Sequence, residues 1–322
     1  MHRNFEEKMA STEPTLATLT NPLLRYFMAT RPQFLSVTFF AALIGIASVH
    51  YSGREVSILT AVITIVFALV VHAGVNVLND YYDELNGTDR INTDRIYPFT
   101  GGSRFIQNGI LTLRATGVFG ALLMGVVVIA GLWLTWQSGP GLLLIGAIGM
   151  LIGWAYSAPP LKLNSRGWGE PCVATGFALI AIGADYVQRG GFSPLVLYAV
   201  ACYALLVTNI LYINQFPDYH ADKAAGKHHW VVRLGRERAR RGYLVVAAIA
   251  YAWFVAVIAR GSLPTLGLIA LLPAVLSFKA GATLMKHATQ PQQLEPAIKM
   301  TIAASLAHGL LLSAAMLVSA PR

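Results

Sequence analysis

Nine long apolar segments alternate with polar connections along most of the chain. They cover residues 34–50, 56–78, 115–136, 141–157, 172–187, 194–213, 242–260, 264–285 and 298–319. A helix that crosses a bilayer needs about 20 consecutive apolar residues, and several of these segments reach that length. The pattern therefore predicts an all-α, polytopic membrane protein built as a bundle of about nine transmembrane helices.

The composition also indicates a membrane protein. Of the 322 residues, 55% are hydrophobic and only 12% are charged, whereas soluble domains carry about 25% charged residues. The opening sequence, MHRNFEEKMASTEP, is polar and lacks the apolar core of a secretory signal. We therefore expect a polar N-terminal tail over residues 1–21 and a single transmembrane domain over residues 22–322.

The net charge of +9 is explained by membrane topology rather than by a nucleic-acid partner. If the N-terminus is cytoplasmic, most of the 24 Lys and Arg residues fall in cytoplasmic connections, and the outer connections hold only Arg54, Arg189, Arg260 and Arg322. This is the positive-inside distribution. We predict a multi-pass protein of the cell (inner) membrane whose N-terminus and active-site loops are cytoplasmic, with no nucleic-acid partner.

The second apolar segment leads directly into a cluster of carboxylates, NDYYDELNGTD. If this segment continues as a helix, Asn79, Asp80 and Asp83 share one face. Carboxylates this close together lose hydration and repel one another, so a cation should compensate them. Oxygen ligands in this number suit Mg²⁺, especially when the ion also holds substrate phosphates. The plainer alternative is a solvated acidic loop.

A second cluster ends the sixth apolar segment, where the sequence reads NQFPDYHADKAAGK. Asn214, Asp218 and Asp222 are four residues apart and line one helical face, and Pro217 is expected to bend the helix there. The spacing Asn-x-x-x-Asp occurs in both clusters, each at the cytoplasmic end of an even-numbered helix. Two facing rows of carboxylates can hold metal ions between them and grip one diphosphate.

Basic residues accompany both clusters. Arg95 and Arg104 follow the first cluster, and Lys223 and Lys227 follow the second. Guanidinium and ammonium groups match the oxygens of a diphosphate. These four residues are therefore candidates for the diphosphate charge that the metal leaves uncompensated.

The fourth apolar segment ends in YSAPPLKL, where paired prolines stop the helix. Tyr156 and Lys162 are left near the membrane interface, where the alternative interpretation is an interfacial tyrosine and a topology lysine. Among the histidines, His72 and His308 lie in apolar segments. We expect them to hydrogen-bond neighbouring helices rather than to bind zinc.

Four motifs carry a family resemblance: NDYYDELNGTD (79–89), PFTGGSR (98–104), YSAPPLKL (156–163) and DYHADKAAGK (218–227). Together with the nine-helix pattern, they resemble the UbiA superfamily of intramembrane prenyltransferases over residues 22–319. The spacing Asp-x₂-Asp-x₅-Asp of the first motif, the PFTGGSR segment and the form of the last motif are most similar to the 1,4-dihydroxy-2-naphthoate polyprenyltransferase (menaquinone) branch.

This resemblance implies a magnesium-dependent transferase that moves a polyprenyl group from an allylic diphosphate to an aromatic acid. It implies 1,4-dihydroxy-2-naphthoate as the acceptor, in menaquinone biosynthesis, with 4-hydroxybenzoate or another aromatic acceptor as the alternative. The implied ligands of magnesium-diphosphate are Asn79, Asp80, Asp83, Asp89, Asp218 and Asp222. Further implied substrate contacts are Arg95, Arg104, Lys162, Asn214, Lys223 and Lys227. The implied catalytic residues are Asp80, Asp83, Asp218 and Tyr156, with Tyr156 beside the reacting allylic carbon.

The expected partners are a polyprenyl diphosphate, an aromatic acid acceptor and the lipid bilayer. The acceptor carboxylate needs a cation that the diphosphate does not already engage. Arg25 and Arg31 are candidates, because both precede the first helix beside the cytoplasmic mouth and lie apart in sequence from both aspartate motifs. The alternative is that they are ordinary positive-inside residues.

An ion-coupled membrane transporter is the alternative from a different functional class, because intramembrane carboxylates also mark ion pathways. In this sequence, however, the acids fall at helix ends on one side of the membrane, next to long basic connections. A ladder of charges through the midplane is not part of the pattern. This placement favours the enzyme.

Overall fold

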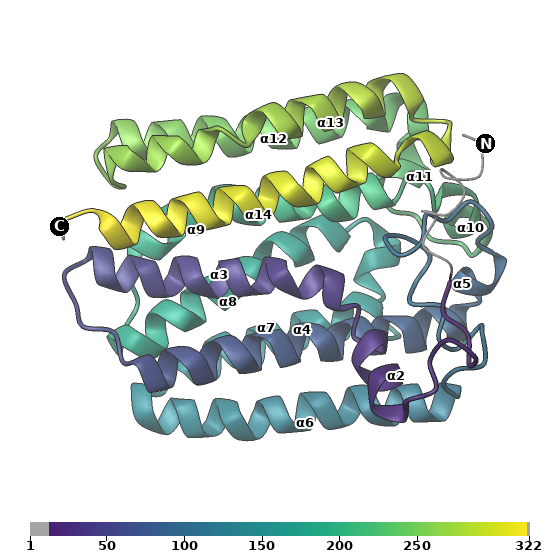
Figure 1. Ribbon diagram of the computed structural model, residues 1–322, viewed down its shortest axis with the longest axis horizontal. Coiled ribbons are helices and arrows are strands. Elements are labelled where there is room, and N and C mark those ends of the chain that lie inside the picture. The colour runs from purple at the N-terminus through teal and green to yellow at the C-terminus, as the bar shows by residue number, and fades with distance from the viewer. Residues whose placement is uncertain (1–12, 321–322) are drawn as a thin grey trace.

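The computed structural model describes residues 13–320, and these residues form helices joined by turns and loops (Figure 1). The helices are α2 (Pro22–Ala29), α3 (Pro32–Tyr51), α4 (Ile58–Asn86), α5 (Thr88–Ile91), α6 (Leu113–Ser138), α7 (Gly141–Ser157), η2 (Leu163–Arg166), α8 (Gly169–Arg189), α9 (Pro194–Asn214), α10 (Tyr219–Ala224), α11 (Trp230–Leu234), α12 (Arg236–Ala259), η3 (Thr265–Leu271), α13 (Ala274–His287), η4 (Pro291–Gln293) and α14 (Glu295–Val318).

The long helices run side by side along the long axis of the molecule, with α9 and α3 in the interior and α6 at one edge (Figure 1). The main core joins α3, α8, α9, α12 and α14 through large buried side chains such as Tyr203, Phe254 and Leu312. Helices α3 and α8 approach closely because position 45 is glycine. A Cβ atom there would lie 2.2 Å from the carbonyl oxygen of Ala181, and small residues allow such backbone contact between membrane helices.

Each of the nine predicted apolar segments is helical in the structure. Helix α4 extends past the predicted end at residue 78 to Asn86, so the first aspartates lie on the helix itself. The predicted helix over 264–285 is instead divided into η3 and α13, which meet at Pro273. Proline removes a backbone donor and clashes with the preceding turn. His308 on α14 hydrogen-bonds the carbonyl oxygen of Ala270 at 2.8 Å beside this break.

The described helices have the lengths and surfaces of a membrane protein. Eight of them are long and apolar enough to cross a bilayer when η3 and α13 are taken together as the span Thr265–His287, and Gly141–Ser157 is a shorter apolar helix. Helix α6 exposes large apolar side chains, including Leu122, Ile129 and Trp136. Water would penalise such a surface, whereas lipid tails accommodate it. The prediction of a polytopic helical membrane protein is confirmed.

The short helices α5, α10 and α11 gather at one end of the bundle, where both aspartate motifs lie (Figure 1). Residues 1–12 of the predicted polar tail lie outside the described residues. The rest of that segment packs on this end: Glu13 forms an ion pair with Arg95, and the carbonyl oxygen of Pro14 accepts a hydrogen bond from Asn108 at 2.9 Å. The N-terminal segment is therefore tied to the loop between α5 and α6.

Cysteine labelling tests the expected orientation of this end. Thr93 and Arg238 are exposed beside the motifs, whereas Glu55 is exposed in the connection at the opposite end of α4. In intact cells, Thr93→Cys and Arg238→Cys should resist a membrane-impermeant maleimide and react only after permeabilisation, because we expect this end to be cytoplasmic. Glu55→Cys should react at once, as the matched outer control. Labelling of Thr93→Cys and Arg238→Cys in sealed cells would contradict the expected orientation and place this end of the bundle outside the cell.

Candidate active site

The first row of polar groups lies on the last turns of α4. Asp80 accepts a hydrogen bond from the Arg31 guanidinium and faces the backbone amide of Ser103 at 3.3 Å. The Asn79 amide donates to Asp83 at 3.1 Å and to the hydroxyl of Ser157 at 2.9 Å. The extension of α4 places these side chains one turn apart on a common face, as the three- and four-residue spacing requires.

The second row lies where α9 ends. The sequence predicts a bend of the helix at Pro217, but α9 instead ends at Asn214, before the proline, and Asp218 is the N-cap position of the separate helix α10. Asp218 accepts a hydrogen bond from the side chain of Asn92 at 2.6 Å. Asp222 contacts the Nε2 atom of His229 at 3.0 Å. The row is not one continuous helical face, yet its carboxylates still point into the same cavity.

Lys227 connects the two rows. Its ammonium nitrogen lies 3.2 Å from an oxygen of Asp83 and 3.2 Å from an oxygen of Asp222. The two aspartates come from motifs that are far apart in the sequence, so this contact shows that the motifs face each other across the bundle. A buried cation between two buried carboxylates offsets part of the cost of removing their charges from water.

The loop between the rows approaches the carboxylates with its backbone. Gly101 and Gly102 have φ of +75° and +76°, a conformation that glycine adopts without steric cost. A Cβ atom on Gly102 would lie 2.2 Å from Oδ2 of Asp89, so any side chain there would displace this carboxylate. The amide of Gly101 faces Asp218 at 3.4 Å. Glycine is thus required where the loop closes over both rows.

The pKa values of the buried aspartates are shifted in opposite directions, depending on which charges lie next to each one. Burial and two neighbouring carboxylates raise the pKa of Asp89 well above its usual range. Burial and the adjacent Asp222 raise the pKa of Asp218 to about 6. For Asp222, burial is outweighed by Lys227 and His229, which lower its pKa. At Lys227, burial alone would lower the pKa of the ammonium group, but the nearby carboxylates of Asp222, Asp83 and Asp89 outweigh this effect and raise it.

The two rows border a polar cavity of about 210 Å³. Its polar wall holds Asn79, Asp83, Asp89, Asp218 and Lys227, among others. The apolar part of the wall comes from α3, α8 and α9. A molecule in this cavity would therefore meet both charged and hydrocarbon surfaces.

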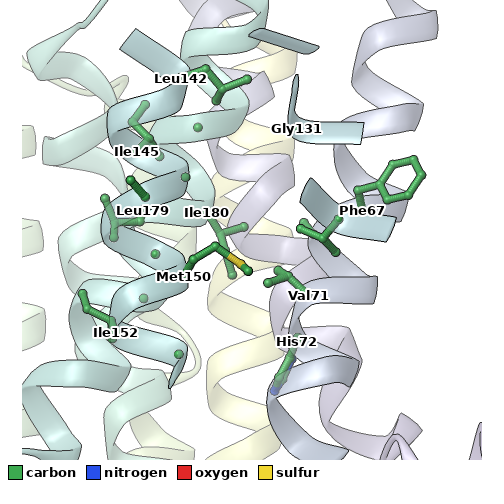
Figure 2. A pocket seen from close by; sticks show the side chains of 18 of the residues that line it. Phe67, Val71, His72, Gly131, Leu142, Ile145, Met150, Ile152, Leu179 and Ile180 are labelled. Carbon is green, nitrogen blue, oxygen red and sulfur yellow. The ribbon is translucent and has the colours of Figure 1, made fainter. Parts of the chain in front are cut away.

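A second, almost wholly apolar cavity of about 550 Å³ lies among α4, α6, α7 and α8. Figure 2 shows its lining, with Leu142 and Gly131 towards one end and His72 at the other. The two cavities share part of their walls, and the shared residues are His72, Val75, Asn76, Tyr156, Val173 and Phe177. Together they fit an amphiphile with an anionic head and a long apolar tail.

The donor set suits a hard divalent cation that shares its coordination with a substrate. Four carboxylates line the polar cavity, namely Asp83, Asp89, Asp218 and Asp222, and its permanent cations are Arg31, which pairs with Asp80, and Lys227. Oδ2 of Asp89 is buried and accepts no hydrogen bond from the described residues. Within residues 13–320, no three acidic, His or Cys side chains are grouped closely enough to chelate an ion by themselves. Mg²⁺ commonly binds one or two carboxylates plus substrate phosphates, and the residues present fit that mode.

The structure brings together most of the residues proposed from the sequence. Those that line the polar cavity are Arg31, Asn79, Asp83, Asp89, Tyr156, Asn214, Asp218, Asp222 and Lys227. Asp80 does not line it but pairs with Arg31, which does. Four basic residues lie outside its wall. Arg95 and Arg104 contact Glu13, Lys162 donates a hydrogen bond to the Asn86 side chain, and Lys223 lies 5.9 Å from the centre of the Tyr219 ring. Diphosphate contacts from these four residues stay predictions.

Sequence reasoning missed three polar partners of the aspartates. Asn92 is buried and bonds Asp218, His229 bonds Asp222, and the Ser103 amide faces Asp80. Asn92 and His229 stand in polar loops, where single residues carry no periodic signal. The Ser103 contact comes from the backbone, so the residue types of its segment, PFTGGSR, gave no signal for it.

Comparison with known proteins shows the family to which the chain belongs. The family model described as "UbiA prenyltransferase family" matches residues 34–303. The 1,4-dihydroxy-2-naphthoate octaprenyltransferase of Escherichia coli (strain K12) is 30% identical over 87% of this chain and 91% of that protein.

Solved structures share the fold. A UbiA homologue of Aeropyrum pernix K1 superposes with a TM-score of 0.65 and 17% identity, over 85% of this chain and 96% of that one. A UbiA homologue of Archaeoglobus fulgidus bound to DMAPP and Mg²⁺ gives a TM-score of 0.58 and 18% identity, over 90% and 99% of the two chains. With a family model that matches most of its length, this chain belongs to the UbiA prenyltransferase family.

Proposed function

We propose that this protein transfers a polyprenyl group from an allylic diphosphate to an aromatic acid, in a reaction that requires Mg²⁺. The acceptor favoured by the E. coli relative's name is 1,4-dihydroxy-2-naphthoate, and the reaction then belongs to menaquinone biosynthesis. The observation that carries the proposal is the pair of cavities. Two facing aspartate rows close a polar cavity, and that cavity shares a wall with a long apolar one.

The two cavities match the two halves of a polyprenyl diphosphate. The head belongs beside Lys227 and the carboxylates, and the tail belongs in the 550 Å³ cavity among α4, α6, α7 and α8. The Archaeoglobus homologue, which was solved with DMAPP and Mg²⁺, supports this assignment. The allylic carbon then lies at the junction of the cavities, where Tyr156 is part of both walls.

The residues that would hold the ion are Asn79, Asp80, Asp83, Asp89, Asp218 and Asp222. Bound there, Mg²⁺ supplies positive charge that stabilises diphosphate as a leaving group. Lys227 adds a fixed cation between the rows. Tyr156 presents an aromatic ring near the carbon where positive charge develops, and such rings attract cations. The apolar walls exclude water, which would otherwise hydrolyse the allylic cation.

The acceptor ring fits the apolar side of the polar cavity, which includes Phe34, Val37 and Ile210. Of the two candidate arginines, Arg25 donates to the carbonyl oxygen of Leu19 at 2.7 Å and does not line this cavity, whereas Arg31 does. Arg31 lies apart from both aspartate motifs in sequence but pairs with Asp80 of the first motif, and its Nε atom is buried without a hydrogen-bond partner among the described residues. We assign this guanidinium to the acceptor carboxylate, because a charge-assisted contact satisfies both groups. For a naphthoate, attack at the carbon that bears the carboxylate releases carbon dioxide.

Product analysis tests the proposal. The protein purified in detergent is incubated with Mg²⁺, a polyprenyl diphosphate, and either 1,4-dihydroxy-2-naphthoate or 4-hydroxybenzoate. We expect a prenylated, decarboxylated naphthalenediol from the first acceptor, and removal of Mg²⁺ by EDTA should abolish its formation. Product from 4-hydroxybenzoate alone would reassign the acceptor. Absence of any prenylated product, together with cation flux in proteoliposomes, would favour the transporter.

A further inference from the structure

His72 lies on α4, two turns before the first aspartate, and contributes to the walls of both cavities. Its Nδ1 atom is 2.7 Å from the hydroxyl oxygen of Thr38 on α3. Its ring packs edge-to-face on Phe177, with 5.5 Å between the ring centres. The expected bond to a neighbouring helix is therefore present, and among residues 13–320 it engages only Nδ1 of the two ring nitrogens.

These contacts fix the orientation of the imidazole. Phe177 limits rotation of the ring, and the Thr38 hydroxyl is fully buried. A hydroxyl can accept a hydrogen bond as well as donate one. When Thr38 accepts from Nδ1–H, Nε2 carries the lone pair and is left for a molecule in the cavities. A partner on one nitrogen commonly sets which tautomer a functional histidine adopts.

His72 lies where the proposed function would place the reacting carbon of the prenyl diphosphate. If the diphosphate lies on the aspartate rows and the tail in the apolar cavity, the allylic carbon lies at the shared wall. The polar side chains of that wall are His72, Asn76 and Tyr156. The amide of Asn76 donates to the carbonyl oxygen of Thr30 at 3.0 Å. His72 is thus the imidazole base nearest to this junction among the lining residues.

We propose that His72 is a catalytic residue that accepts the proton of the acceptor's hydroxyl group, an inference that rests on the proposed function. A ring carbon of the acceptor forms a bond to the allylic carbon of the prenyl group. The bond between the allylic carbon and the diphosphate oxygen breaks, and diphosphate leaves with the electron pair of that bond. The hydroxyl becomes a carbonyl, and its proton passes to Nε2. If the attacked carbon carries a carboxylate, loss of carbon dioxide leaves an enolate oxygen, and the imidazolium returns the proton to it.

Two substitutions test this role. His72→Gln keeps a polar side chain of similar length but provides no base, so prenyl transfer should fall about 100-fold, the scale of a lost general base. The KM for the prenyl diphosphate should stay within about twofold. His72→Ala should be as inactive, and added imidazole should restore transfer, whereas pyrazole, a ring of the same size and much weaker basicity, should not.

The matched control is His308→Gln, which also removes a buried histidine bonded to a neighbouring element but lies outside both cavity walls. Its rate of transfer should stay near that of the wild type. Near-normal transfer by His72→Gln, or equal rescue by pyrazole, would show that His72 only fills space. Failure of the proposed function is a separate result, because the wild-type protein would then form no prenylated aromatic product.

Discussion

Asp83→Asn should lower prenyl transfer about 10²–10³-fold, the usual cost of removing one group that stabilises charge in a transition state, while the protein stays folded in detergent. The amide has the same shape as the carboxylate, so its packing on α4 is kept. It loses the charge that faces Lys227 at 3.2 Å and that would hold Mg²⁺. Asp218→Asn should have the same effect from the second row. The measurement is kcat at saturating concentrations of both substrates, with a titration of Mg²⁺.

Glu84→Gln is the matched control for this result. Glu84 is the next residue on the same helix, but its carboxylate contacts Arg90 and Gln107 rather than the cavity. Its neutralisation should leave kcat within about twofold, because the Glu84 carboxylate does not line the polar cavity. If Asp83→Asn and Asp218→Asn kept near-normal kcat and needed the same Mg²⁺ concentration for half-maximal activity as the wild type, a metal site formed by two facing rows would be contradicted.

The parts of this site that could be predicted are those with a periodic signal. Asn79 and Asp83 stand at helical spacing at the end of an apolar segment, so charge at the membrane boundary marks them as unusual. The second row repeats that spacing after another apolar segment. The prediction that the two rows face each other came from topology, because the second and the sixth apolar segments end on the same side of the membrane. The contact of Lys227 with Asp83 and Asp222 bears this out.

The parts that could not be predicted depend on long-range contacts of loop residues. Arg95 follows the first motif, which suggested a diphosphate contact, yet in the structure its guanidinium binds Glu13 at 2.6 Å. Asn92 reaches Asp218, although 126 positions separate them in the sequence. Periodicity says nothing about such pairs, because no repeated spacing links a loop residue to its partner. The same limit explains why His72 was expected only to join helices, although it also lines both cavities.

Lys227→Met should have the largest combined effect on stability and activity. The side chain is largely buried between Asp83 and Asp222, and removing one partner of a buried ion pair costs about 3–5 kcal/mol because the remaining charges stay uncompensated. In Mg²⁺-free detergent, the apparent unfolding temperature should fall by about 10 °C. Added Mg²⁺ should recover part of this loss, since a cation between the rows again offsets their repulsion. Transfer should fall at least about 100-fold, because a fixed cation beside the diphosphate is lost.

Lys223→Met separates this effect from a general loss of positive charge. Lys223 lies four residues earlier, in the same motif, but it is exposed and stands over the Tyr219 ring rather than between carboxylates. Its removal should leave the unfolding temperature within about 1 °C, because exposed charges contribute little to stability. If Lys223→Met and Lys227→Met lowered the unfolding temperature equally, the bridge between the two motifs would not be what holds them together. If only Lys227→Met did so, and Mg²⁺ restored it, the same carboxylates that bind the lysine would be the ones that bind the ion.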